Sequence, residues 1–94
     1  MKLAIALSLL LPVVVTGQSW KSISEQAAQA YHAGRYDEAL QLTHESIKTA
    51  EQEFGNTHAN YFTSVGDLAT ILKKKGKYTD AQKIEQENLQ GIER

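Results

Sequence analysis

From residue 18 onwards, small and apolar residues recur at steps of three and four, with polar residues between them. This is the period of a helix that buries one side. The pattern predicts four helices, over about 20–33, from 36 to about 54, from about 57 to 75, and from 78 towards the C-terminus. The positions expected on their buried sides are Ile23, Ala27, Ala30, Tyr31, Ala39, Leu42, Ser46, Ile47, Ala50, Tyr61, Phe62, Val65, Leu68, Ala69, Leu72, Ala81, Ile84, Leu89 and Ile92.

Glycines separate these helices. Gly34 and Gly76 each follow a helical stretch directly, where glycine can adopt the left-handed conformation that other residues resist. Gly55 interrupts the pattern between the second and third helices and is the expected stop. Near the C-terminus, Gly91 is expected to fray the last helix.

Polar residues near the helix starts are the candidate caps. For the first helix the candidates are Ser22 and Ser24, and Ser22 with Glu25 three residues later fits a capping box. For the third helix they are Asn56 and Thr57.

The chain repeats itself with a period of 42 residues: the segment Ala33–Ala39 reads AGRYDEA and returns as KGKYTDA at Lys75–Ala81. Further out, the equivalent pairs are Ala27 and Ala69, Ile23 and Val65, Leu42 and Ile84, and Ile47 and Leu89. Such a period is typical of stacked units, none of which buries its apolar side alone. We therefore expect an all-α fold of two antiparallel helix hairpins, side by side. Architectures of this kind usually bind other proteins.

The repeated residue types fit close helix packing. A bare methyl group lets two helices approach, and the small residues expected at the crossings are Ala27, Ala39, Ala69 and Ala81. Tyr36 and Tyr78 follow the turns, and we expect each ring to fill the wedge between hairpin arms while its hydroxyl stays wet.

The first 17 residues have the layout of a secretory signal peptide. A positive charge at Lys2 precedes an apolar run from Leu3 to Val15 that Pro12 breaks, and small residues favour a cut after Gly17 or Ser19. We therefore expect residues 1–17 to be a signal peptide and residues 18–94 to form the domain.

A signal peptide implies a secreted or periplasmic protein. The apolar run is well short of the roughly 20 residues that span a bilayer, so we expect no stable membrane anchor after cleavage; a retained anchor is the alternative. The chain has no cysteine and therefore no disulfide.

Charge gives no indication of a nucleic-acid partner. The formal net charge is −1. The lysine-rich run at 73–77 falls at a predicted helix end, where cations offset the helix dipole, and no aromatic residues interleave with it.

The polar residues do not form a recognisable catalytic or metal-binding pattern. His32, His44 and His58 are not spaced as metal ligands, and we expect His58 to serve the linker and His44 to face water. The serines and threonines lack a histidine partner, so we expect no enzyme and no cofactor.

The repeated residues resemble the tetratricopeptide repeat. The match is a small residue, seven positions to a glycine, then X-Tyr-X-X-Ala, and it holds from Ala27 to Ala39 and from Ala69 to Ala81. The 42-residue period is similar to the variety found in kinesin light chains. Thr43 and Glu85 depart from the pattern, because the family usually carries an aromatic residue there.

The resemblance implies a protein or peptide partner in a concave groove lined by the first helix of each hairpin. The positions carried over are Lys21, Ser24, Ala28, Tyr31, His32, Thr63, Gly66, Thr70, Lys73 and Lys74. They describe a mildly basic, partly aromatic surface suited to an acidic or polar peptide, or else an ordinary solvated one. A leftover apolar side at the end of the stack would favour docking or a homo-oligomer. The alternative function is a structural scaffold or assembly factor of an envelope complex that binds no peptide.

Overall fold

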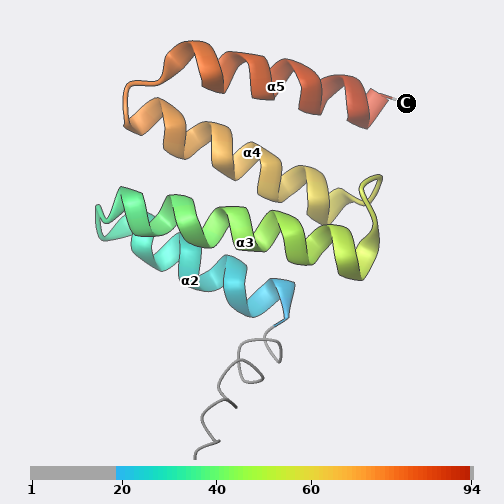
Figure 1. Cartoon of the computed structure of the whole chain (residues 1–94), viewed down its shortest axis with the longest axis horizontal. Helices are drawn as coiled ribbons and strands as arrows, with labels where there is room; N and C mark the ends of the chain where they lie inside the picture. Colours follow the sequence, from blue (N-terminus) through green and yellow to red (C-terminus); the bar gives the residue numbers. More distant parts are fainter. Residues whose placement is uncertain (1–18, 94) are drawn as a thin grey trace, which may run out of the picture.

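The computed structural model of the chain describes residues 19–93; the predicted signal peptide lies outside them. It contains four helices, α2 (Trp20–His32), α3 (Tyr36–Phe54), α4 (Ala59–Lys74) and α5 (Tyr78–Glu93), and the described part has no strand. Figure 1 shows them as an antiparallel succession in which each helix lies beside the next. The predicted all-α fold of two helix hairpins is confirmed.

Alanines occupy the helix crossings, as predicted. Ala39, Ala69 and Ala81 are 0% exposed, and Ala27 is buried as well. At such positions a methyl group allows close approach, and a larger side chain would force the helices apart. The core is therefore made largely of small side chains, with aliphatic residues of α4 packed against them.

Both hairpin turns have the same hydrogen-bonded geometry. Gly34 and Gly76 adopt φ values of +80° and +82°. Behind Gly34, the amide of Arg35 donates to the carbonyl of Ala30 at 2.9 Å, and Lys77 repeats this with Leu72 at 2.8 Å. This is the Schellman ending, in which a left-handed residue satisfies the last carbonyls of a helix.

Two helices begin at residues that the sequence pattern did not favour. Ser19 caps α2, since its hydroxyl accepts from the amide of Ser22 at 3.2 Å; the expected cap at Ser22 or Ser24 is wrong. His58 caps α4 through its Nδ1, which accepts from the amide of Asn60 at 3.0 Å. The candidates Asn56 and Thr57 therefore belong to the loop before it, and His58 serves the linker as expected.

Gly91 does not end α5, which continues to Glu93. A Cβ atom at Gly91 would lie 2.8 Å from the ring of Phe62, so the missing side chain allows α4 to approach closely. The amide of Asn88 strengthens the same contact by donating to the Phe62 carbonyl at 3.0 Å.

The two repeated tyrosines differ in environment, so the expectation that both rings fill a wedge is wrong for one of them. Tyr36 is half-buried against the cluster that contains Ile71, with its ring 5.6 Å from that of Tyr31. Tyr78 is 67% exposed. The position equivalent to Tyr31 in the second repeat is Lys73, and no described helix stands where α4 covers Tyr36.

Leu89 and Ile92 are likewise exposed, each to 55%, although both were expected on a buried side. The equivalent of Leu89 in the first repeat is Ile47, which packs against α4. The described part of the chain has no helix in the corresponding place beside α5.

Candidate partner-binding site

A hollow lies between the first helices of the two hairpins. It has a volume of about 210 Å³ and is open to solvent on one side. Helices α2 and α4 form its walls, and Thr43 of α3 contributes to its floor. The remaining lining residues are Ser24, Ala27, Ala28, Tyr31, His32, Asp67, Thr70 and Ile71.

Half of the predicted partner-binding residues lie in this hollow. They are Ser24, Ala28, Tyr31 and His32 of α2, together with Thr70 of α4. Three others, Lys21, Thr63 and Lys74, are exposed but do not line it.

Gly66 and Lys73 lie on the other side of α4, towards α5. A Cβ atom at Gly66 would meet the side chain of Asn88, and the Lys73 ammonium pairs with the Glu85 carboxylate. The family pattern takes the same helix positions from each repeat. A hollow between two helices instead uses facing sides, so α2 and α4 contribute mostly different positions, and Ala28 with its equivalent Thr70 is the pair that they share.

Asp67 is the acidic residue of the hollow and, like Ala27, Thr43 and Ile71, was not among the predicted partner-binding residues. It follows Thr63 by four residues and precedes Thr70 by three, so it shares their side of α4, and this spacing is the signal that would have found it. Burial raises the pKa of the Asp67 carboxyl above its ordinary value. The hollow therefore holds a carboxylate that would gain from a cationic neighbour.

Aromatic contacts hold Tyr31 at the wall of the hollow. Its ring lies edge-on to His32 with centroids 5.4 Å apart, and tilted against Tyr36 at 5.6 Å. Ring pairs at these separations stabilise one another beyond the area that they bury. Tyr31 is thus held in place by its aromatic neighbours.

A chain of hydrogen bonds beneath the hollow joins three helices. The indole N–H of Trp20 donates to the Ser64 hydroxyl at 2.7 Å, and Ser64 shares a hydrogen bond of 2.7 Å with Ser46. Ser46 in turn bonds to Ser24 at 3.0 Å, and Ser24 lines the hollow. Ser46 and Ser64 are buried, where a satisfied polar network fixes one arrangement of the helices.

Among the described residues, five of the predicted partner-binding residues meet in this hollow. Within 19–93, no three histidine, cysteine, aspartate or glutamate side chains gather as a metal-binding group. In the same part of the chain, no helix combines the length and the apolar character needed to cross a membrane. The arrangement can accept a side chain or a short extended segment between two helices.

Stacked helix hairpins with a hollow between their first helices define the class of helical repeat proteins. The model of the tetratricopeptide repeat family matches the chain over residues 22–92. The chain therefore belongs to the tetratricopeptide repeat family, and its 42-residue period is consistent with the kinesin-light-chain-like variety. The curated proteins gave no match, and neither did the solved structures.

Proposed function

We propose that this protein is a non-enzymatic interaction module that holds an extended segment of a partner protein between α2 and α4. Tetratricopeptide repeats generally mediate protein–protein interaction. The observation that carries the proposal is the hollow itself, where five predicted residues meet with Asp67.

The chemistry of the hollow favours a cationic side chain in the partner. The expectation of a mildly basic groove relied partly on Lys73, which is paired with Glu85, and on Lys74, which does not line the hollow. The acidic side chain that lines the hollow is that of Asp67. A lysine or arginine of the partner could pair with this carboxylate in a charge-assisted hydrogen bond. The volume of about 210 Å³ suits one side chain rather than a folded domain.

Peptide binding tests this proposal. We expect a library of short fluorescent peptides to select sequences with a lysine or arginine, and Asp67→Asn to weaken their binding. The matched control is Glu25→Gln, because Glu25 is the repeat equivalent of Asp67 on α2 and lies outside the hollow. Equal effects of the two substitutions, or selected peptides without enrichment of basic residues, would contradict a site at Asp67.

A second substitution separates the hollow from a purely structural role. Ala28→Glu places a bulky side chain in the hollow at an exposed position of α2, so the fold should survive. Loss of peptide binding with unchanged helical content supports the proposal. If the native partner stays bound to this variant, the scaffold or assembly function is favoured instead.

We also propose that the protein acts outside the cytoplasm. The support is the positive start and apolar run of the first 17 residues. Mass spectrometry of the protein expressed from its full sequence should find Gln18 or Trp20 at the N-terminus. An intact N-terminus on the exported protein would indicate a retained anchor.

A further inference from the structure

The outer side of α5 carries an uncovered stripe that is distinct from the hollow. Three of the four large hydrophobic side chains exposed among the described residues belong to it: Tyr78, Leu89 and Ile92. With Gln82 and Glu85 they follow steps of four, three, four and three. This is the spacing of a seam along which two helices pack.

The first repeat shows what such a stripe does. Its equivalents on α3 are Tyr36, Leu40, Thr43, Ile47 and Ala50. Thr43 and Ala50 are buried, and Leu40 and Ile47 pack against the α4 cluster. The stripe on α5 therefore corresponds to the side of α3 that packs on the next hairpin. Its apolar side chains lie at the two ends of the stripe, and its polar side chains lie between them.

Stacking in a head-to-tail row is not supported by the opposite end of the molecule. The residues of α4 that pack towards α3 include Leu68 and Ile71. Their equivalents on α2 are Gln26 and Gln29, and the Gln26 amide donates to Ser22 at 3.3 Å. Because this side of α2 is polar, it would bury amide groups against the apolar ends of the α5 stripe.

We propose that α5 of one chain packs antiparallel on α5 of a second copy, forming a two-fold symmetric dimer centred on Glu85. In this register Tyr78 of each copy lies opposite Ile92 of the other, and Gln82 lies opposite Leu89. A two-fold axis lets the same patch of each copy serve both sides of the interface.

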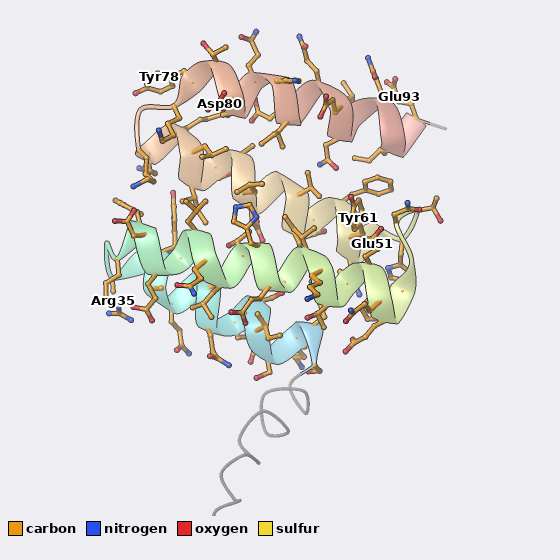
Figure 2. All side chains as sticks on the ribbon, viewed as in Figure 1. Arg35, Glu51, Tyr61, Tyr78, Asp80 and Glu93 are labelled. Atoms are coloured by element: carbon orange, nitrogen blue, oxygen red, sulfur yellow. The ribbon has the colours of Figure 1, made fainter. Side chains whose placement is uncertain are left out.

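Charge complementarity selects the antiparallel orientation. Lys73 and Lys75 already pair with Glu85 and Asp37. Lys74 and Lys77 lie at the α4–α5 turn, whereas Glu51 and Glu93 lie at the opposite end of the helices (Figure 2). Antiparallel packing places the basic end of one copy beside the acidic end of the other, and parallel packing would place like charges together.

The centre of the seam carries an ion pair instead of an apolar contact. Glu85 pairs with Lys73 of α4, and the two-fold axis brings two such pairs together so that each lysine can meet both carboxylates. Charged groups at the middle of a small interface add little affinity but fix the register. The dimer is thus expected to be weak and reversible.

Sedimentation of the protein expressed from its full sequence tests the proposal. We expect a monomer–dimer equilibrium between low micromolar and millimolar concentration, and Leu89→Glu should weaken association about tenfold or more. Leu89 is already exposed, so helical content should not change. The control is Gln29→Glu on the polar side of α2. A monomer throughout this range, or equal effects of the two substitutions, would overturn the proposal.

Cysteine cross-linking tests the register, because the native chain contains no cysteine. A mixture of Gln82→Cys and Leu89→Cys chains should oxidise to a mixed dimer faster than either chain alone. If each variant links to itself as readily, the antiparallel register is wrong. If the protein is monomeric yet Leu89→Glu abolishes capture of its native partner, the stripe docks a foreign helix and self-association is rejected.

Discussion

The indole nitrogen of Trp20 lies 2.7 Å from the hydroxyl of Ser64, which joins the first turn of α2 to the first helix of the next repeat. The Trp20 ring also meets Phe54 edge-on at 5.9 Å, and Phe54 stacks on the capping residue His58 at 4.7 Å. Trp20, in the first turn of α2, thus contacts both α4 and the end of α3, and Phe54 extends the cluster to the residue that caps α4. The two hairpins are held together at this point by more than helix packing.

Removal of the Ser64 hydroxyl should therefore destabilise the whole domain. Ser64→Ala leaves the part-buried indole N–H of Trp20 without its partner, whereas Ser46 keeps its bond to Ser24, and an unsatisfied buried donor costs about 1–3 kcal/mol. Urea denaturation should show this loss, with Thr63→Ala on the exposed side of α4 as the control. Trp20→Phe in the Ser64→Ala background should cost less than in the native chain, because both substitutions break the same bond. Additive effects would show that the bond carries no stability.

The two equivalent tyrosines should respond differently to the same substitution. Tyr36→Ala removes a ring packed in the cluster with Ile71 and should cost about 1–3 kcal/mol. Tyr78→Ala removes a ring that is 67% exposed and should change the free energy of unfolding of the monomer by about 0.5 kcal/mol or less. Denaturation at submicromolar concentration, below the expected dimer range, makes the comparison. A large loss for Tyr78→Ala would mean that a described helix covers it after all.

The repeat explains what could and could not be predicted from the sequence. Some repeated positions have the same local surroundings in both repeats, so the sequence pattern predicted them correctly twice. These are the buried alanines Ala39 and Ala81 and the turn glycines Gly34 and Gly76. The expected burial of Tyr78 and Leu89 is wrong because it depends on a helix beside α5, and the described part of the chain has none in that place.

Two further misses came from contacts between distant segments. Only half of the predicted partner-binding residues line the hollow, because the repeat pattern does not say which side of α4 faces α2. Asp67 lies on that side. Gly91 was expected to fray α5, whereas its role depends on the contact with Phe62, which no local pattern reveals.

One substitution should have opposite effects at two glycines. Gly34→Ala introduces a side chain at φ +80°, a conformation that costs an L-residue about 1–2 kcal/mol although the space is open. Gly66→Ala lies inside α4 with its nearest neighbour, the Asn88 amide, at 3.8 Å, so it should stabilise the domain by up to about 1 kcal/mol. Thermal denaturation of both variants gives the signs. Gly34→Asn should be milder than Gly34→Ala, because asparagine tolerates the left-handed region; the reverse order would place the cause in space rather than in backbone conformation.

Two aspartates should make stability depend on pH in opposite directions. The hydrogen bond and the charge of Lys75 lower the pKa of Asp37. The charged form therefore favours the fold above the ordinary aspartate pKa, and this contribution is lost as the pH falls through the lower, folded pKa. Burial raises the pKa of Asp67, so its charged form disfavours the fold at neutral pH and the penalty disappears in acid.

Asp37→Asn should accordingly lower stability at pH 7 and Asp67→Asn should raise it, with both differences from the native chain vanishing in strong acid. Denaturation midpoints between neutral and strongly acidic pH test this, with Asp80→Asn as an exposed control. Since protonation removes the charge that attracts a basic peptide, binding in the hollow should also weaken as the pH falls through the pKa of Asp67, and binding that strengthens in acid would exclude Asp67 as the contact.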